Sequence, residues 1–354
     1  MADPTQKAGG ANLSNVLDDA ASRAAGLWAV DVSNVDLLAV SENAVYRVDT
    51  ASGDRFVLRL HRPGYNTIDE MRFEQRWVHS LHADGIAVPG PRPSLVGNSY
   101  ESVPVDDPNS SAPSSSRRWA GAIDWVDGIK LADLIDDRGV DEQLEAVPSL
   151  YHAVGALAAR IRVHAGEWEL PDGFVRRSWD ADGLLGPEPL WGRFWEVSAL
   201  TSAQADLLTT ARNQLYDILR SLQTDASRYG LIHADLHQSN VMFATDSAER
   251  DRGIAIDFDD AGFGWFIHEL GVALQAVIDE PWVATAREAL IDGYRSVYPL
   301  DDEELGLLDT FCTIRTLMII GWLDARPELE QHEQLSDYIS WACEEAEKYL
   351  GVTR

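Results

Sequence analysis

The stretch Leu231–Ala261, LIHADLHQSNVMFATDSAERDRGIAIDFDDA, decides the fold of this chain. It contains three short apolar runs: Leu231-Ile232, Val241–Phe243 and Ile254–Ile256. Runs of this length between polar segments are typical of short buried strands. The pattern therefore predicts a strand–loop–strand that holds Asp235 and Asn240, and a further strand that ends at Asp257.

The polar residues after these strands have the chemistry that phosphoryl transfer requires. In kinases, an H-x-D-x-x-x-x-N loop places an aspartate that accepts the proton of the substrate hydroxyl, and its asparagine reaches a metal ion. An aspartate on the next strand holds the metal that bridges the nucleotide phosphates. Here Asp235, Asn240 and Asp257 fill these three positions, and their carboxylate and amide oxygens are ligands that Mg²⁺ prefers.

Two other interpretations of this stretch are weaker. Asp and Asn are common turn formers, so a plain turn in a helical protein could contain them. An apolar strand followed by D-F-D-D makes a chance match much rarer. A zinc site at His233, Asp235 and His237 would need further His or Cys ligands, which the sequence does not offer nearby.

Length and composition limit the class of protein. The chain has 354 residues, of which 45% are hydrophobic, so it can bury a sizeable core in two or three domains or in one two-lobed unit. Its formal net charge of −29 argues against a nucleic-acid partner, because neutralising phosphates requires a basic surface. The same charge is compatible with a cationic substrate, although an acidic solvated surface is the simpler explanation.

Cysteine usage and hydropathy indicate the compartment. Cys312 and Cys343 are too few for a disulfide framework, and both are expected to be buried, reduced thiols. No apolar run approaches the ~18 residues of a membrane span. Residues Met1–Asn12 lack the apolar segment of a secretory signal. We therefore expect a soluble, cytoplasmic protein without a membrane partner.

The N-terminal part of the chain has the pattern of a strand meander. A helix is expected at Leu13–Leu27, followed by three strands: Val35–Val40, Ala44–Val48 and Phe56–Leu60. A second helix is expected at about Ile68–Ala83, where Thr67 and Glu70 form a capping box. Two more strands should flank the Ser/Pro/Asp-rich loop Asp106–Ser116, which we expect to be mobile surface.

The pattern becomes mostly helical after Gly128. A long apolar stripe runs from Leu144 to Ile161, a second helix is expected at Ala205–Leu222, and helical spacing continues from His268 to the end. The predicted strands of Leu231–Ala261 interrupt these helices as a small β-island.

With these motifs, the chain resembles the aminoglycoside phosphotransferase and choline kinase-like family. The family pattern is close to HGDLHxxNVL…VIDFDDA, and this chain reads HADLHQSNVM and later AIDFDDA. The segments Ser41–Val48, Phe56–Pro63 and Glu70–Glu74 resemble the nucleotide lobe of bacterial homoserine-kinase-like and stress-response-kinase-like members. The resemblance spans about Ser41–Leu274.

The resemblance implies an α+β, two-lobed protein-kinase-like fold. This fold has a small antiparallel-sheet N-lobe with one main helix, and a larger, mostly helical C-lobe. We expect an N-terminal helical extension at residues 1–30, a nucleotide-binding N-lobe at 31–123, and a C-lobe at 124–354. The C-lobe should carry the catalytic and metal loops and the substrate-binding helices.

The resemblance also implies roles for single residues. Asp235 would be the catalytic base, and Asn240 and Asp257 would be the ligands of Mg²⁺. The hinge Ile123–Val126, including Asp124 and Val126, would meet the adenine of ATP through its backbone. His233 would hold the loop by hydrogen bonds, whereas His237 could belong to the loop or to the substrate side.

Three acidic residues near the metal loop have less definite roles. One of Asp259 and Asp260 would lie near the metal or the substrate, and the other would cap the loop. Glu269 would replace the aspartate that supports the catalytic loop in the family.

The chain departs from the usual kinase pattern in its N-lobe. Kinases place a lysine on the third strand to hold the phosphates, but this chain has no lysine between Lys7 and Lys130. Arg59 takes that place, and we expect it to pair with Glu74 and to contact phosphate. A surface arginine on a hairpin is the alternative.

A glycine-rich phosphate loop is also missing from the N-lobe sequence. Ser41 and Asn43 occupy that turn, so backbone N–H groups and these small polar side chains should meet the phosphates.

The sequence thus predicts an ATP-dependent phosphotransferase that acts on a hydroxyl of a small molecule, such as an aminoglycoside, choline or a homoserine-like alcohol. A protein Ser/Thr kinase of the stress-response type is an alternative, although the chain lacks an A-P-E segment. A non-catalytic pseudokinase is favoured by the Lys-to-Arg exchange and opposed by the intact Asp235, Asn240 and Asp257. The acceptor pocket is expected around Ser178–Glu196 and the helices after Glu280, and the tryptophans of Ser178–Glu196 could instead be core. The oligomeric state stays open.

Overall fold

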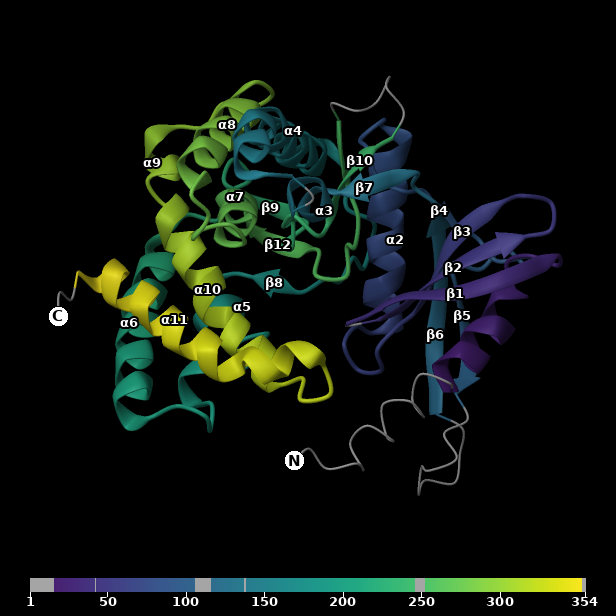
Figure 1. Ribbon diagram of the computed structural model, residues 1–354, viewed down its shortest axis with the longest axis horizontal. Helices are drawn as coiled ribbons and strands as arrows, with labels where there is room; N and C mark the ends of the chain where they lie inside the picture. Colours follow the sequence, from purple (N-terminus) through teal and green to yellow (C-terminus); the bar gives the residue numbers. More distant parts are fainter. Residues whose placement is uncertain (1–15, 42, 106–115, 137, 246–251, 352–354) are drawn as a thin grey trace. The chain divides into compact units, whose positions relative to one another are not determined.

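The computed structural model describes residues 16–41, 43–105, 116–136, 138–245 and 252–351. These residues form two compact units (Figure 1). The N-lobe comprises the described residues up to Asp84, together with Val88–Val126 and Gly173–Val175. The C-lobe comprises Gly85–Ala87, Asp127–Asp172 and the described residues from Arg176 onward.

The N-lobe is built on an antiparallel sheet. Its strands are β1 (Val32–Val40), β2 (Ala44–Thr50), β3 (Arg55–Leu60), β4 (Pro91–Arg92), β5 (Tyr100–Val105) and β6 (Ser116–Asp124). The order is β1-β2-β3-β6-β4, with β5 also paired to β6. The predicted meander is confirmed. The short strand β4 was not predicted, because Pro91 and its neighbours Pro89, Gly90 and Pro93 are residues that strands usually avoid. Of the expected mobile loop Asp106–Ser116, residues 106–115 lie outside the described part, and Ser116 begins β6.

Helices cover the N-lobe sheet as the sequence pattern requires. Residues 16–25 are helical, and their apolar side chains share one core with Tyr46, Phe56, Leu58 and Leu60 on alternate positions of β2 and β3. Alternation along a strand places Arg59 on the opposite face. Helix α2 (Ile68–Ala83) has its predicted bounds, and its capping box is present.

The C-lobe is mostly helical. Its helices are α3 (Leu131–Asp136), α4 (Val140–Glu167), α5 (Ala181–Leu185), η1 (Phe194–Glu196), α6 (Ser202–Ser221), α7 (Ile267–Gln275), α8 (Val283–Arg295), α9 (Asp302–Leu305), α10 (Leu308–Asp324), η2 (Glu330–Gln334) and α11 (Leu335–Leu350). With the antiparallel sheet of the N-lobe, this helical unit confirms the predicted α+β, protein-kinase-like class.

Two small sheets in the C-lobe carry the polar loops. Their strands are β7 (Gly128–Lys130), β8 (Ser178–Trp179), β9 (Tyr229–Ile232), β10 (Val241–Ala244), β11 (Gly253–Ala255) and β12 (Gly262–Trp265). One sheet has the order β11-β10-β7 and the other β8-β12-β9. The β-island is therefore confirmed, and β7, β8 and β12 are additions to it.

The central helix α10 belongs to a long, predominantly apolar segment. The segment Asp302–Asp324 is long and apolar enough to cross a membrane by length and composition, and 67% of its apolar window is buried inside the fold. Charged residues such as Asp309 and Arg315 interrupt this segment, so it is not an uninterrupted apolar run of the kind that the sequence analysis considered. Helix α10 is apolar on most sides because it packs against both α7 and α11. Cys312 on α10 and Cys343 on α11 are buried and free, as predicted.

Helices α4 and α8 approach each other so closely that glycine is required at the contact. A Cβ atom on Gly155 would lie 2.0 Å from the carbonyl oxygen of Leu290, and one on Gly293 would lie 1.9 Å from that of His152. We expect Gly155→Ala to lower the free energy of unfolding by about 3 kcal/mol, because backbone atoms cannot move aside cheaply. Denaturant unfolding measures this change.

Gly166 in the same helix is the matched control. A Cβ atom there would meet nothing within 4 Å. Gly166→Ala should therefore raise stability by about 0.5 kcal/mol through helix propensity. Equal effects of the two substitutions would contradict the tight contact between α4 and α8.

Candidate active site

The loop between β9 and β10 brings Asp235 and Asn240 together. Asn240 Nδ2 donates hydrogen bonds to the Asp235 carbonyl oxygen at 3.0 Å and to Asp235 Oδ2 at 2.8 Å. The backbone N–H of Ile256 donates to the Asn240 carbonyl oxygen at 3.0 Å, which places the residue before Asp257 beside this loop. Because the amide nitrogen of Asn240 is committed, its Oδ1 is the atom suited to a metal.

The carboxylate of Asp235 lies between an arginine and an imidazole. Arg315 Nη2 on α10 donates to Asp235 Oδ1, and His237 Nε2 lies 3.5 Å from Asp235 Oδ2. Burial alone would raise the pKa of Asp235, but His237 and Arg315 outweigh burial and hold that pKa below its ordinary value. Asp235 is therefore an ionised hydrogen-bond acceptor at neutral pH.

His233 fixes the start of the loop, as the sequence predicted. Its Nδ1 accepts from the backbone N–H of Asp235 at 3.2 Å, so its Nε2 donates to the Ile256 carbonyl oxygen at 2.9 Å. The ring packs on Phe258, and burial lowers its pKa to about 4. A neutral, buried imidazole of this kind holds a structure rather than carrying protons.

The backbone is left-handed at two non-glycine residues of the described chain, and both lie in this site. Ala234 has φ 65° and Asp257 has φ 66°. Such conformations cost about 1 kcal/mol or more for residues with a Cβ. Glu269 Oε1 accepts from the N–H of Ala234 at 3.0 Å, which supports the loop at its strained residue. Glu269 therefore has the supporting role that was expected of it.

Glu269 makes the stability of the protein depend on pH. Burial raises its pKa from 4.5 to about 7, so its folded pKa lies above its unfolded pKa. The stability that the protonated form contributes is complete below pH 4.5 and is lost as pH rises to about 7.

Glu269→Gln keeps an acceptor for Ala234 but removes this titration. We expect its unfolding free energy, relative to the parent, to grow by up to about 3 kcal/mol between pH 4.5 and pH 7 and then to level off. Denaturant unfolding of both proteins at several pH values measures this difference. The buried His233 and His268 are present in both proteins, so their contributions to the pH dependence cancel. A difference that does not change with pH would show that Glu269 is charged in the fold.

The D-F-D-D segment is held by residues that precede and form β8. Arg176 is buried, and it donates from Nε to the Ala261 carbonyl oxygen at 2.5 Å and from Nη2 to that of Asp259 at 2.7 Å. Arg177 Nη1 lies 2.7 Å from Asp260 Oδ1, and both side chains are buried. The Asp260 carboxylate thus anchors the loop to Arg177.

The tryptophans near this segment are mainly core residues. Trp179 and Trp191 are buried, and Trp179 Nε1 donates to the carbonyl oxygen of Asp260 at 2.7 Å. The sequence alone allowed these tryptophans to be either core residues or substrate contacts. Because both side chains are buried, they are core residues.

The candidate nucleotide residues lie in the N-lobe. Arg59 on β3 and Glu74 on α2 are both buried. Asn43 is buried as well, and its Oδ1 accepts from the N–H of Arg62 at 3.1 Å, whereas Ser41 is exposed.

The predicted hinge at the end of β6 is fixed by arginine. Asp124 Oδ1 accepts from Arg92 Nε at 2.5 Å, and the Asp124 N–H donates to the Gly90 carbonyl oxygen at 2.8 Å. Val126, the last N-lobe residue of the hinge, is half-buried. The nucleotide contacts of these residues stay predictions.

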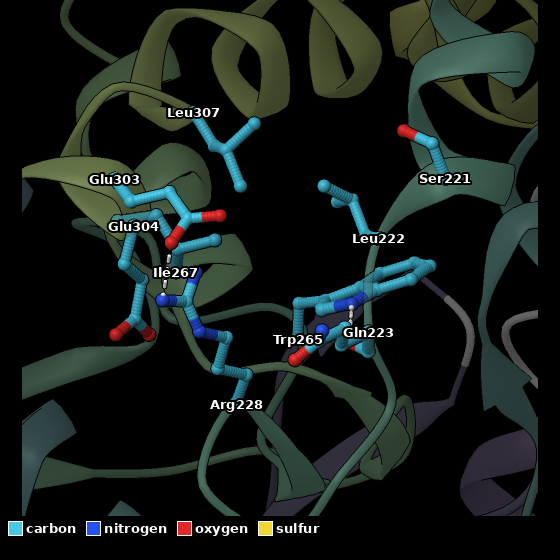
Figure 2. A pocket seen from close by; sticks show the side chains of 9 residues that line it. All are labelled: Ser221, Leu222, Gln223, Arg228, Trp265, Ile267, Glu303, Glu304 and Leu307. Carbon is cyan, nitrogen blue, oxygen red and sulfur yellow. Dashed lines mark hydrogen bonds and ion pairs between the residues drawn. The ribbon is translucent and has the colours of Figure 1, made fainter.

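A separate cavity of about 110 Å³ lies elsewhere in the C-lobe (Figure 2). It is lined by Ser221, Leu222, Gln223, Arg228, Trp265, Ile267, Glu303, Glu304 and Leu307. Arg228 Nη2 donates to Glu303 at 2.8 Å, and Trp265 Nε1 donates to the Gln223 carbonyl oxygen at 2.9 Å. The cavity is smaller than the ~300 Å³ of typical ligand pockets and contains none of the predicted site residues.

Comparison with known proteins decides the family. A model of the phosphotransferase enzyme family matches residues 37–306. The chain belongs to this family. As a member, it is a kinase-type phosphotransferase with an alcohol group as acceptor, as the sequence predicted, and family membership implies the use of ATP.

Several relatives resemble this phosphotransferase over most of its length. An amicoumacin kinase from Bacillus subtilis (strain 168) is 26% identical over 349 residues, which cover 96% of this chain and 90% of that protein. A homoserine kinase from Rhizobium johnstonii is 30% identical over 274 residues, which cover 75% of this chain and 72% of that protein. The solved structure of a microcompartment-associated aminopropanol kinase has a TM-score of 0.78 at 27% identity and covers 94% of this chain and 97% of that one.

The donor set of this phosphotransferase suits a metal shared with a nucleotide. Within the described residues, no group of three or more His, Cys, Asp or Glu side chains could hold a metal. Asn240 and Asp257 offer one amide and one carboxylate. Mg²⁺ is commonly bound by few protein oxygens, with substrate phosphates and water completing its octahedral shell.

Proposed function

We propose that this chain is an ATP-dependent, magnesium-requiring kinase that transfers the γ-phosphate of ATP to a hydroxyl group of a small molecule. The observation that carries the proposal is the pair of bonds from Asn240 Nδ2 to Asp235, beside the strained backbone of Asp257. Relatives named for amicoumacin, homoserine and aminopropanol support a small-molecule alcohol as acceptor.

In this proposal each loop residue has a defined task. The acceptor hydroxyl donates its proton to the Asp235 carboxylate while its oxygen bonds to the γ-phosphorus. The bond from that phosphorus to the β–γ bridging oxygen breaks, and ADP leaves with the electron pair. Asn240 Oδ1 and the Asp257 carboxylate would hold Mg²⁺, which neutralises charge on the phosphates when it is bound.

The other expectations fit the same proposal. We propose that the protein has no nucleic-acid partner, on the basis of its net charge of −29, and we keep the cytoplasmic location and the absence of a membrane partner as proposals. A pseudokinase is the second candidate, because Arg59 stands where kinases have lysine. Its weakness is that Asp235, Asn240 and Asp257 are all retained.

The test is Mg²⁺-dependent conversion of ATP to ADP in the presence of amino alcohols, hydroxy amino acids, choline and aminoglycosides. We expect at least one of these alcohols to stimulate ADP formation, with a phosphate ester visible by ³¹P NMR. Nucleotide binding without ADP formation for any acceptor, including Ser/Thr peptides, would favour the pseudokinase.

Arg59 should supply the positive charge that the missing lysine would give. We expect Arg59→Ala to weaken ATP binding and turnover together, and Arg59→Lys to keep part of both, because lysine retains the charge but not the planar fork. Calorimetric titration with an ATP analogue measures the affinity. ATP affinity equal to that of the parent would place the phosphate contact elsewhere.

A further inference from the structure

A buried arginine from a distant helix contacts the candidate catalytic carboxylate. Arg315 lies on α10, 80 residues after Asp235 in the sequence, and its Nη2 donates to Asp235 Oδ1. Its side chain is only 7% exposed, while that of Asp235 is 18% exposed. A charge this deeply buried is retained only if partners satisfy it.

Arg315 contacts the oxygen of the Asp235 carboxylate that is turned away from the proposed metal ligand. Asn240 and His237 approach Oδ2, whereas Arg315 approaches Oδ1. Since Asn240 is the proposed metal ligand, the phosphates belong on the Oδ2 side. Arg315 therefore lies on the side from which the acceptor alcohol would reach Asp235.

The guanidinium of Arg315 has donors that its neighbours do not use. A guanidinium carries five N–H groups in a fixed plane. Across the described parts of the chain, its one hydrogen bond is that to Asp235, and its other nitrogens are not fully enclosed. The Arg315 Cζ atom lies 4.3 Å from the centre of the Trp191 ring, so the guanidinium packs against this aromatic ring.

We propose that Arg315 binds a carboxylate of the acceptor, so that the substrate is a small hydroxy acid or hydroxy amino acid rather than a simple amino alcohol. This inference rests on the proposed function. When the acceptor hydroxyl forms a hydrogen bond with Asp235, a substituent of the acceptor about one to three bonds from that hydroxyl lies against Arg315. A carboxylate there satisfies the planar fork, whereas an ammonium group would meet a like charge.

The test uses two pairs of alcohols that differ by one carboxylate. L-Threonine is paired with 1-amino-2-propanol, and L-homoserine with 3-amino-1-propanol. For the parent we expect kcat/KM to favour the carboxylate member of at least one pair by about 10- to 100-fold, the usual size of a charge-assisted hydrogen bond. Arg315→Met should abolish this preference and Arg315→Lys should keep part of it.

The preference within a pair is a better readout than the rate itself. Arg315 also contacts Asp235, so its loss can slow both members of a pair, but that effect cancels in the ratio. Arg287→Met is the matched control. Arg287 lies on α8 and pairs with Asp309, which lies on α10 like Arg315. We expect it to leave the ratio unchanged.

The outcomes separate this inference from the proposed function. Turnover of alcohols with no preference for the carboxylate member, or a preference that survives in Arg315→Met, overturns the role of Arg315 and leaves the kinase assignment intact. If no acceptor is phosphorylated, the function fails. Saturation-transfer NMR with the same four alcohols then decides: binding of a carboxylate member that Arg315→Met abolishes supports the site, and its absence overturns it.

Discussion

Asp235→Asn is expected to lower turnover by roughly 10²–10⁴-fold, the usual size of a lost general base. An amide of the same shape cannot take the proton of the acceptor hydroxyl. It also cannot form the ion pair that Asp235 makes with Arg315. Because the nucleotide is assigned to other residues, its affinity should stay nearly unchanged, and single-turnover kinetics with calorimetric ATP titration measure both quantities.

A variant outside the loop controls for the loss of an arginine–aspartate pair. Asp309→Asn removes the pair with Arg287 and does not touch the loop. Its turnover should equal that of the parent. If Asp235→Asn consumes ATP in the presence of an acceptor as fast as the parent, then Asp235 is not the base.

Asp257→Asn is expected to lower turnover by roughly 10²–10³-fold, comparable to removing one group that stabilises charge in the transition state. The left-handed backbone of Asp257 is one that asparagine also tolerates, so this variant removes the charge and keeps the fold of the loop. We expect the Mg²⁺ concentration for half-maximal activity to rise at the same time. A titration of activity with Mg²⁺ measures this.

Asp257→Ala separates the charge from the backbone. Alanine lacks the local hydrogen bonding that favours the left-handed region, so this variant should lose stability as well as activity. An unchanged Mg²⁺ dependence in Asp257→Asn would show that the metal is held by other residues.

Local patterns determined much of what the structure contains. Helix α2 has the bounds expected from its capping box, because the cap is formed by residues three apart. The strands β2 and β3 follow from alternation and from the turn between them. The close approach of Asp235 and Asn240 was also predictable, since their spacing belongs to one loop.

The supports of that loop come from outside its own sequence. Glu269 reaches Ala234 from 35 residues away, and Arg176 reaches Asp259 across 83 residues. No periodicity marks Arg176 or Arg315 as more than an arginine within its segment. Their roles depend on which side chains the fold buries together.

The sequence by itself thus determined the fold class and the family, and it singled out Asp235, Asn240 and Asp257 as the residues proposed for phosphoryl transfer. These features are encoded by short spacings that hydrogen bonds and apolar periodicity enforce locally. Only the tertiary structure decided that Arg315 contacts Asp235 and packs against the Trp191 ring. A buried charge must be satisfied by whatever partner the packing provides, and packing between distant helices is not written in any local pattern.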